Sequence, residues 1–400
     1  MNLRTAMHSA SEVVVTPKSG RRWCGCVAAW MLGLAAVCAA QAQAPAGFVV
    51  AGYIFPRNTV LTPDQIDARG LTRINFAFAA IRDGRLVTGA ECDEQNLAVL
   101  TGLRKQNPSL TVLVSAGGWL GSAEFSDLAL TTQSRSAFAD SAMDFLKRYD
   151  LDGLDVDWEY PGMAGAGHPF RAEDKRNFTL LLQDLRKAFD QEEKTSGRRL
   201  ILTIAAGATN DYLAHTEMNK VQRWVDAVNL MTYDYRLPPA DATTGHSAPL
   251  FTNPAAPRSE SADASVKAFE RAGVPAGKIV LGVPFYVHAW GQVPDQNHGL
   301  LQPGKQSPDD FAPYSAVQSS MLGHGFIRYW DAAASVPYLY NADKQEFVSY
   351  EDPESLGDKC GYVKTHQLGG VMFWEYSGDP SGALLHVIDD ALQPSAAGAH

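Results

Sequence analysis

Four carboxylates lie within the nine residues 152–160, in a stretch that otherwise has the apolar character of a buried β-strand. Successive side chains of a strand point to opposite faces, so Asp155, Asp157 and Glu159 share one face. Asp152 falls on the other face, and we expect it to be structural. Burying several carboxylates together is costly unless they share protons or hydrogen bonds. Because the rest of the strand is apolar, this conflict predicts a functional site rather than a solvated edge strand.

The size and charge of the chain narrow the possible classes of protein. Its 400 residues, 46% of them hydrophobic, suffice for one large α/β barrel or for two smaller domains. The formal net charge is −10 and there is no long basic run, which argues against nucleic acid or an anionic membrane as the partner. The aromatic content suits a neutral ligand with flat faces, and we expect a monomer.

The first 42 residues have the pattern of a signal peptide. Two arginines precede an apolar stretch over 23–40, and a small-residue cleavage pattern ends at Ala42. The stretch is short for a membrane span and has no charged stop beyond it. We therefore expect cleavage after Ala42 and secretion, extracellular or periplasmic, with no membrane attachment of the mature chain. Cys92 and Cys360 would remain, which permits one disulfide without requiring it.

Beyond this segment the chain alternates between strand-like and helix-like patterns. Eight short apolar, β-branched or aromatic runs lie at 48–55, 73–81, 111–115, 153–158, 200–206, 227–233, 278–285 and 370–375. Helical periodicity separates most of them, as over 138–149 and 178–189. Eight strands that alternate with helices predict a closed parallel (β/α)₈ barrel. Chemistry in such barrels sits at the carboxyl ends of the strands, where the acidic residues fall.

One segment does not follow this alternation of strand-like and helix-like patterns. Residues 287–346 are rich in Gly, Pro, Tyr and Trp and match neither a barrel strand nor a long helix. We expect them to form a small α+β subdomain, inserted between the seventh and eighth strands and forming one wall of a cleft. The barrel would then comprise 46–286 and 347–392, followed by a disordered tail over 393–400.

Three other predicted strands also end in residues that are typical of ligand sites. These ends are 115–119 (SAGGW), 231–235 (MTYDY) and 373–376 (FWEY). Each of them alone is more often core or turn. All of them at the same end of one barrel indicate a single site. The paired glycines of the first are expected to let the backbone pass close to a ligand.

These segments carry a resemblance to a known family. Residues 152–159 resemble the DxxDxDxE motif of family 18 glycoside hydrolases, the chitinases and their relatives. Residues 115–118 resemble the SxGG of that family, 231–235 its MTYDY, and 370–379 its last-strand motif. The segment 287–346 is similar to the chitinase insertion domain, which marks the subfamily with a deep cleft.

The resemblance implies a retaining hydrolysis in which the substrate's own acetamido oxygen attacks the anomeric carbon. By motif position Glu159 would be the acid and base, with its pKa raised by neighbouring Asp157. Asp157 would accept the acetamido N–H, and Asp155 would share a proton or hydrogen bond with Asp157. Tyr233 would donate a hydrogen bond to the acetamido oxygen.

The resemblance also implies the residues that bind the sugars. Trp374 would form the floor under the reacting sugar, and Trp119 a stacking platform on the leaving-group side, because sugar C–H faces pack on aromatic rings. Asp234 would lie against the sugar or the acid beyond it. Further substrate-binding residues are expected at Met231, Tyr160 and Tyr286, at Tyr53 and Phe55 at the opposite end of the cleft, and at His288.

His288 departs from the family pattern. After the seventh strand the family often has Tyr-Gly-Arg, whereas this chain has Tyr286, Val287 and His288. A histidine that faces the cleft would gain the missing positive charge only below about pH 6.5. The alternative is a histidine that is hydrogen-bonded within the inserted segment.

The predicted function is a secreted chitinase that cuts β-1,4-linked N-acetylglucosamine polymers without a cofactor or metal. A second possibility is a hydrolase of another acetamido-sugar polymer, such as peptidoglycan or the core of N-glycans. A chitin-binding lectin on the same fold is a third, although lectin relatives generally lack the catalytic glutamate. A divalent metal bound by the acidic cluster is a fourth.

Overall fold

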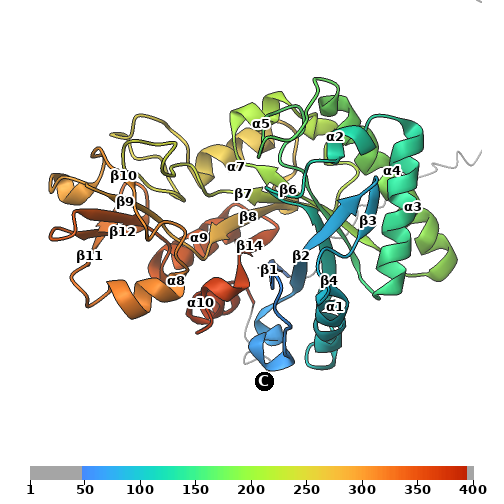
Figure 1. Cartoon of the computed structure of the whole chain (residues 1–400), viewed down its shortest axis with the longest axis horizontal. Helices are drawn as coiled ribbons and strands as arrows, with labels where there is room; N and C mark the ends of the chain where they lie inside the picture. Colours follow the sequence, from blue (N-terminus) through green and yellow to red (C-terminus); the bar gives the residue numbers. More distant parts are fainter. Residues whose placement is uncertain (1–46, 394–400) are drawn as a thin grey trace, which may run out of the picture. The chain divides into compact units, whose positions relative to one another are not determined.

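The computed structural model of the protein describes residues 47–393 (Figure 1). The predicted signal peptide, 1–42, lies outside the described residues. So does the predicted disordered tail, apart from Gln393.

Eight parallel strands form a closed barrel, as the sequence predicted. They are β1 (Val49–Ile54), β2 (Arg73–Arg82), β4 (Thr111–Gly117), β5 (Gly153–Asp157), β6 (Ile201–Gly207), β7 (Ala227–Met231), β8 (Ile279–Pro284) and β14 (Gly370–Trp374). Their order around the barrel is β1-β14-β8-β7-β6-β5-β4-β2, and pairing between β1 and β2 closes the ring. A short β3 (Arg85–Val87) extends β2 as an antiparallel hairpin. The strand sequences are continuously apolar because both faces of each strand are buried, one inside the barrel and the other against the helices.

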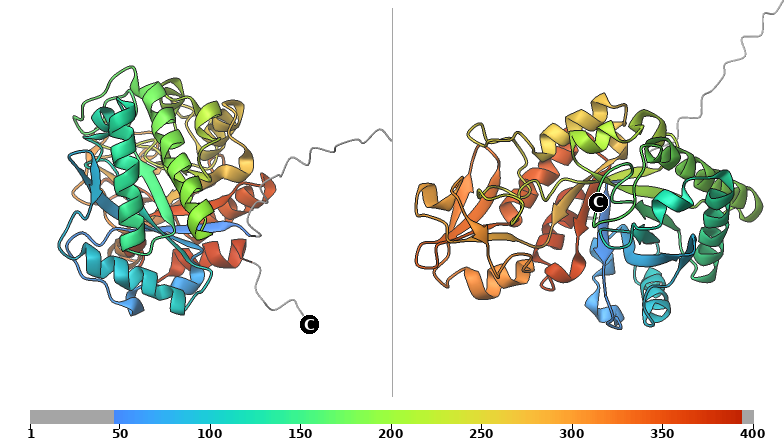
Figure 2. Two further views of the ribbon diagram at one scale, coloured as in Figure 1. Left: turned by 90° about the vertical axis from the view of Figure 1, so that its right-hand side faces the viewer. Right: turned by 45° about the horizontal axis from the view of Figure 1, so that its top comes forward.

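Helices cover the outside of the barrel. The longer ones are α1 (Asp93–Gly102), α3 (Thr132–Arg148), α4 (Asp174–Ser196), α7 (Ala262–Arg271), α9 (Pro353–Thr365) and α10 (Ala383–Leu392). Shorter ones are α2 (Phe125–Leu128), α5 (Asn210–Ala214) and α6 (Met218–Val221). Figure 2 shows α3 and α4 side by side against the strands. Each buries an apolar stripe with helical spacing, and burying one Phe or Leu side chain stabilises the fold by about 1.5–3 kcal/mol.

A second, antiparallel sheet interrupts the barrel between β8 and α9. Its order is β10 (Lys305–Gln306), β9 (His288–Gly291), β13 (Glu346–Ser349), β12 (Val336–Asn341) and β11 (Ile327–Asp331). It has its own apolar cluster around Trp290 and Phe347, and the short α8 (Tyr314–Ala316) runs into a π-helical turn beside it. The segment predicted over 287–346 ends at the first residue of β13, so the sheet extends three residues further, to Ser349.

The structure bears on two further questions, whether the two cysteines pair and whether a helix could cross a membrane. Cys92 is half-buried and Cys360 is buried, and neither forms a disulfide. Of the two possibilities that the sequence left open, the structure therefore has separate thiols. Within residues 47–393 no helix is both long enough and apolar enough to cross a membrane.

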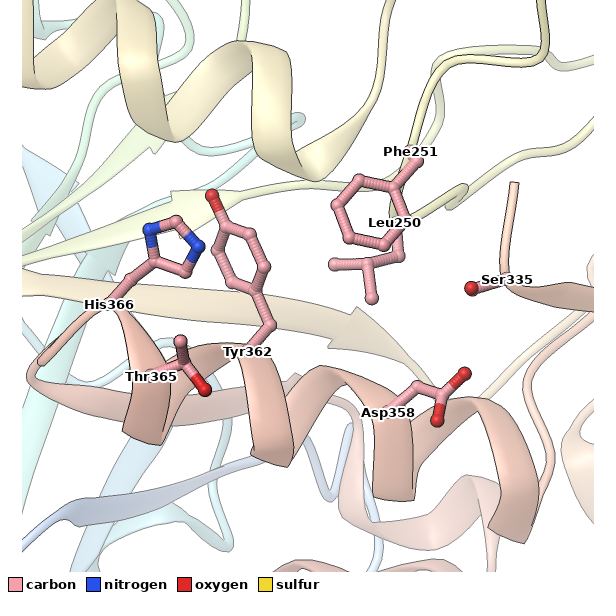
Figure 3. A pocket seen from close by; sticks show the side chains of 7 residues that line it. All are labelled: Leu250, Phe251, Ser335, Asp358, Tyr362, Thr365 and His366. Carbon is pink, nitrogen blue, oxygen red and sulfur yellow. The ribbon is translucent and has the colours of Figure 1, made fainter. Parts of the chain in front are cut away.

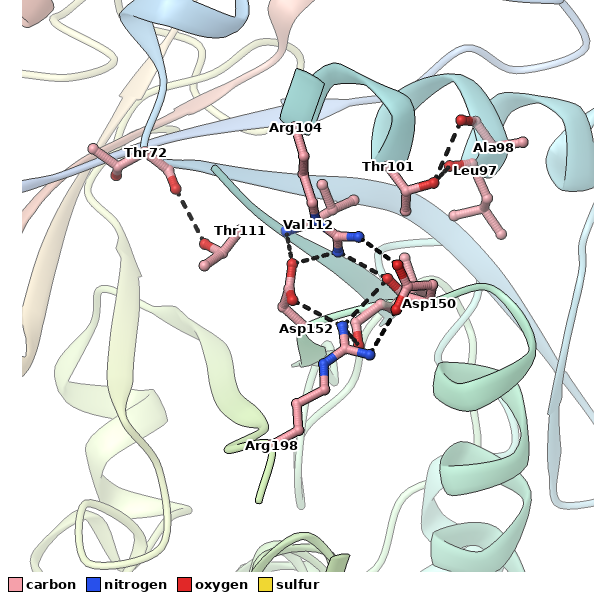
Figure 4. A network of polar contacts seen from close by, with 11 residues as sticks. Thr72, Leu97, Ala98, Thr101, Arg104, Thr111, Val112, Asp150, Asp152 and Arg198 are labelled. Atoms are coloured by element: carbon pink, nitrogen blue, oxygen red, sulfur yellow. Dashed lines mark hydrogen bonds and ion pairs between the residues drawn. The ribbon is translucent and has the colours of Figure 1, made fainter. Parts of the chain in front are cut away.

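Asp152, immediately before β5, is held in a network of ion pairs (Figure 4). Its carboxylate accepts hydrogen bonds from the guanidinium groups of Arg104 at 2.6 Å and Arg198 at 2.9 Å. It also accepts one from the backbone N–H of Val112, at 2.7 Å. These contacts tie the start of β5 to β4 and to the segments on either side, as expected of a structural residue.

We expect Asp152→Asn to destabilise the fold and to leave the predicted activity largely unchanged. The substitution keeps the shape but removes the charge that two guanidinium groups contact, so the free energy of unfolding should fall by about 1–3 kcal/mol. Urea unfolding measures this loss. Asp211→Asn is the control, because Asp211 forms an exposed pair with His215 and such pairs contribute little. Full stability together with a large loss of the predicted activity would contradict a structural role for Asp152.

Candidate active site

Asp155 lies in the middle of the barrel with none of its surface exposed. Its two carboxylate oxygens accept hydrogen bonds from side chains on four other strands. The donors are Tyr53 (β1) at 2.8 Å, Ser115 (β4) at 2.8 Å, Thr203 (β6) at 2.5 Å and Asn229 (β7) at 3.0 Å. Burial raises the pKa of Asp155, and these hydrogen bonds oppose the shift because they favour the ionised form.

Asp157, the last residue of β5, has a different environment. It is buried, and its Oδ1 has no hydrogen-bond partner among the described residues. Burial raises the pKa of Asp157 well above its usual range, and the nearby charges of Glu159 and Asp155 raise it further. The pKa values of both carboxyls are therefore raised, and the two groups titrate as an interacting pair.

Glu159 follows β5 at the carboxyl end of the barrel. Its backbone N–H donates to the hydroxyl of Ser122 at 2.9 Å, and that hydroxyl in turn donates to backbone carbonyls, including that of Asp157 at 3.1 Å. Burial raises the pKa of Glu159 to about 7; a hydrogen bond with Tyr160 lowers it and the charge of Asp234 raises it. Burial is the largest cause of the shift; the charges of Glu159 and Asp157, the pair expected from the sequence, interact as well.

The paired glycines Gly117 and Gly118 let the end of β4 pass close to Asp157 and Phe78. Both have left-handed backbone angles, with φ of 112° and 78°. A Cβ on Gly117 would lie 2.0 Å from the carbonyl oxygen of Asp157, and one on Gly118 would lie 2.6 Å from the ring of Phe78. The backbone N–H of Gly118 donates to that same carbonyl at 2.8 Å. The close approach predicted from the glycines exists, but its partner is the acidic strand.

An apolar cluster of side chains forms the floor of the barrel mouth. It brings together five predicted site residues, namely Tyr53, Phe55, Met231, Tyr233 and Trp374. The ring of Trp374 stacks on Phe78, with centroids 5.5 Å apart, and also contacts Phe55 at 5.7 Å. Tyr53 was expected to line the end of the cleft, and this placement was wrong. Tyr53 is buried beside Trp374, and its hydroxyl donates a hydrogen bond to Asp155.

Aromatic side chains also stand at the rim beyond β4 and β5. Trp119 is 52% exposed, and its ring meets the edge of Tyr160 with centroids 6.4 Å apart. The backbone carbonyl of Trp119 contacts the Nε2 atom of His168 at 2.7 Å, which links it to the loop that follows β5. An indole held in this way presents a flat apolar face to the solvent.

Asp234 connects the barrel to the inserted sheet. Its Oδ1 accepts hydrogen bonds from the hydroxyl of Tyr286 at 2.5 Å and from Nε2 of His288 at 2.9 Å. The Nδ1 atom of His288 contacts Oδ1 of Asp310 at 2.8 Å. Burial lowers the pKa of His288, but the hydrogen bonds and charges of both aspartates outweigh burial and raise it to about 9.

Of the two placements that the sequence left open for His288, the structure has the second, a histidine hydrogen-bonded within the inserted segment, to Asp310. Its side chain is fully buried and also reaches Asp234, so the expectation that it faces the cleft was wrong. It also carries its positive charge at neutral pH, not only below about 6.5, because it lies between two carboxylates. The histidine is therefore a buried cation between the barrel and the inserted sheet.

Sequence reasoning missed several supporting residues. Thr203 and Asn229 solvate Asp155, Ser122 holds the backbone of Glu159, and Asp310 pairs with His288. Thr203 and Asn229 could have been found, because each is a polar residue inside an apolar strand run. Nothing in the local sequence marks Ser122 or Asp310, which lie in loops.

Other features of the described residues do not belong to this site. No group of three or more His, Cys, Asp or Glu side chains within 47–393 is arranged to hold a metal ion. A surface hollow of about 350 Å³ lies against α9 (Figure 3) and contains none of the predicted site residues. It is lined by Leu250, Phe251, Ser335, Asp358, Tyr362, Thr365 and His366.

The chain is also similar to known proteins. The model of the family described as glycosyl hydrolases family 18 matches residues 49–379. Chitinase A1 from Niallia circulans is 40% identical over 322 residues, which cover 76% of this chain and 46% of that protein. This chain therefore spans just under half the length of that relative.

Two solved structures are also similar. A family 18 N-acetylglucosaminidase from Paenibacillus barengoltzii is 44% identical with a TM-score of 0.79, and the match covers 86% of this chain and 100% of that one. A mutant class V chitinase from Nicotiana tobaccum in complex with NAG4 is 28% identical with a TM-score of 0.79. That match covers 87% of this chain and 99% of the other.

The raised pKa of His288 predicts a specific dependence of stability on pH. The charged histidine stabilises the folded chain fully below its unfolded pKa of about 6.5, and this stabilisation is lost as the pH rises through about 9. Over that window the advantage of the native chain over His288→Gln should shrink by on the order of 3 kcal/mol, measured as the free energy of unfolding in urea. His386→Gln is the control, because His386 pairs with Asp67 at the surface. A difference that does not change with pH would exclude a buried cationic histidine.

Proposed function

The chain belongs to family 18 of the glycosyl hydrolases, and from this premise we propose that it hydrolyses β-1,4 linkages between N-acetylglucosamine units in chitin and chitooligosaccharides. The observation that carries the proposal is the row of carboxyls along and beyond β5. Asp155 is solvated by the protein, Asp157 has a carboxyl oxygen without a partner among the described residues, and Glu159 has a pKa of about 7. Such a row offers one anion, one hydrogen-bonding group and one proton donor.

In the first step Glu159 donates its proton to the glycosidic oxygen while the bond from that oxygen to the anomeric carbon breaks. The acetamido oxygen of the same sugar attacks the anomeric carbon and forms an oxazolinium ion. Asp157, whose Oδ1 has no partner among the described residues, accepts the acetamido N–H, which orients the nucleophile and stabilises the positive charge. Tyr233, at the same mouth of the barrel, donates its hydroxyl proton to the acetamido oxygen.

In the second step the carboxylate of Glu159 takes a proton from water, and the oxygen of that water attacks the anomeric carbon. The oxazolinium ring opens, and the acetamido group is restored. Two displacements at one carbon leave the product in the β configuration. A pKa of about 7 suits a group that must give and then take a proton near neutrality.

The aromatic side chains account for binding of the sugars. Trp374 lies at the barrel mouth as a floor for the reacting sugar, and Trp119 is an exposed platform beyond β4. Asp234 is partly exposed at the rim and offers its second oxygen to a hydroxyl of the bound sugar. Its Oδ1 is held by Tyr286 and His288.

A second candidate is an N-acetylglucosaminidase, which is favoured by the similarity to the Paenibacillus barengoltzii protein of that name. The two differ in product rather than in chemistry. Mass spectrometry of the products from chitin hexamer and insoluble chitin distinguishes them, because an N-acetylglucosaminidase releases single sugars. The same measurement on peptidoglycan and N-glycans tests the other acetamido-sugar polymers.

The lectin and metal alternatives require different observations. A lectin would bind oligosaccharides without cleaving them, whereas the environment of Glu159 suits a proton donor. A metal-dependent site would lose its activity in a strong chelator. The signal peptide expected over 1–42 lies outside the described residues, and we propose export to the cell exterior or periplasm on the sequence pattern alone.

Replacing Glu159 by glutamine should separate catalysis from binding. The amide keeps the shape of the side chain but cannot donate the proton, so turnover of chitin oligomers should fall by roughly 10²–10⁴ while affinity for them persists. Turnover is measured by product release and affinity by calorimetry. Near-normal turnover in Glu159→Gln would refute the assigned role, and loss of both properties would indicate a folding defect.

The acetamido group should be essential in the substrate itself. If its oxygen is the nucleophile, fully deacetylated chitosan should be inert and partially acetylated chitosan should be cut only after an acetylated unit. Mass spectrometry of the products identifies the sugar at each new reducing end, and NMR identifies its anomer, which should be β at first. Frequent glucosamine at the new reducing end would contradict substrate assistance and point to a protein nucleophile.

A further inference from the structure

Arg73 is a charged residue inside the barrel. It begins β2, and its register partner on β1 is Ala51, which lies in the same interior cluster as Tyr53. Only 8% of its surface is exposed, whereas an arginine ordinarily keeps its charged end in water. A guanidinium at this depth is costly unless it has charged or hydrogen-bonding partners. The position of Arg73 therefore requires a partner inside the barrel.

Several buried polar atoms near Arg73 have no hydrogen-bond partner among the described residues. They are Nε and Nη1 of Arg73, both polar side-chain atoms of Asn75 on the same strand, and Oδ1 of Asn229 on β7. β2 and β7 are four places apart in the ring of eight strands, so they face each other across the barrel interior. Buried polar groups almost always have a partner, and internal water is that partner where the protein supplies none. We therefore expect bound water between Arg73 and Asn229.

This part of the interior lies beneath the acidic row. The strand register aligns Asp155 with Ser115 of β4, and Ser115 with Ala77 of β2. Arg73 comes before Ala77 on β2, so it lies nearer the amino ends of the strands than Asp155 does. Asn229 connects the two levels, because its Nδ2 atom donates to Asp155 at 3.0 Å while its Oδ1 atom is unpartnered.

The charge of Arg73 matches that of Asp155. Burial raises the pKa of Asp155 and the charge of Arg73 opposes this, whereas burial lowers the pKa of Arg73 and the charges of Asp155 and Asp226 oppose that. Asp226 already has two other cations, Arg186 at 3.1 Å and Arg199 at 2.5 Å. The four hydrogen-bond donors of Asp155, by contrast, are uncharged. Asp155 is therefore the carboxylate that lacks a cation without Arg73.

We propose that Arg73 is a positioning residue for the proposed reaction: its guanidinium, linked to Asp155 through bound water and Asn229, supplies the positive charge that balances this carboxylate. The inference rests on the proposed function, in which the pair of Asp155 and Asp157 stabilises the oxazolinium ion. The pair does so only while it carries negative charge. Arg73 keeps the pair from taking up its last proton until a lower pH, and it thereby extends activity toward acid.

The other titratable groups around the pair are the same with or without Arg73. Tyr53 faces Asp155 from β1, and β4, β6, β7, β8 and β14 contain no titratable residue. Beyond β5, Asp157 interacts with Glu159 and with three phenols whose pKa values burial raises, so that the phenols stay neutral. These are Tyr160, Tyr212 and Tyr233.

A purely structural role for Arg73 makes a different prediction. The guanidinium would then only fill the interior of the barrel. Its replacement would lower the free energy of unfolding, and it would reduce turnover by the same factor at every pH.

The test measures kcat/KM on N-acetylglucosamine oligomers against pH and, in parallel, the titration of the aspartate pair. Carboxyl-carbon NMR of isotope-labelled aspartate follows that titration, with the resonances assigned by Asp155→Asn and Asp157→Asn. Arg73→Gln and Arg73→Met both remove the charge, and methionine is the variant to use if the amide prevents folding, because apolar residues replace buried ions at little cost. Both the acidic limb of the profile and the titration should move to higher pH by about 0.5–1 unit.

Two further variants serve as controls. Arg73→Lys retains the charge, so the acidic limb and the titration should stay close to those of the parent. Arg135→Gln removes an equally buried guanidinium, 6% exposed, that pairs with Asp184 on the helices outside the barrel. It should lower the free energy of unfolding without moving either curve.

The outcomes separate this inference from the function on which it rests. If the parent cleaves no acetylated oligomer, the proposed function is wrong, and the titration still decides whether Arg73 balances Asp155. If the titration is unchanged in Arg73→Met, the inference is wrong whatever the activity. A titration that moves while the acidic limb stays would overturn the role of Arg73 in the reaction. An equal loss of turnover at every pH, with both curves unmoved, would assign Arg73 to the structural role.

Discussion

A carboxylate in the middle of a closed barrel cannot be solvated by bulk water, so the protein has to supply its hydrogen bonds. Asp155 receives them from Tyr53, Ser115, Thr203 and Asn229, and each of these donors comes from a different strand. The arrangement of the upper barrel depends on this demand. Tyr53 lies beneath the aromatic floor, and the polar residues Thr203 and Asn229 stand in strands that are otherwise apolar. A single buried charge thus determines which side chains can fill the barrel around it.

The other two carboxyls of the row have different surroundings. Burial and the charges of Glu159 and Asp155 raise the pKa of Asp157 well above its usual range, and its Oδ1 has no partner among the described residues. Burial is the main cause that brings the pKa of Glu159 to about 7. Three carboxyls in one row therefore have three different environments. This separation of roles is what general acid–base chemistry needs from residues of the same kind.

The inserted sheet contributes a fixed positive charge and one wall. His288 lies between Asp234 of the barrel and Asp310 of the insertion, so its charge holds the two parts together at the edge of the site. Both carboxylates would be costly beside one another without it. The same contact holds the segment that carries Phe311, whose ring stacks on Tyr286.

The eight strands, their closure into a barrel and the row of Asp155, Asp157 and Glu159 were predictable from the sequence, because they depend on local periodicity. The two-residue repeat of a strand is enough to place three acids on one face. The charge state of His288 was not predictable, because it depends on Asp310, a loop residue whose position only the tertiary structure decides. The cause of the pKa shift of Glu159 was hidden for the same reason. Burial and proton sharing are properties of surroundings that distant segments of the chain assemble, whereas the sequence by itself determines only the order and local geometry of its own residues.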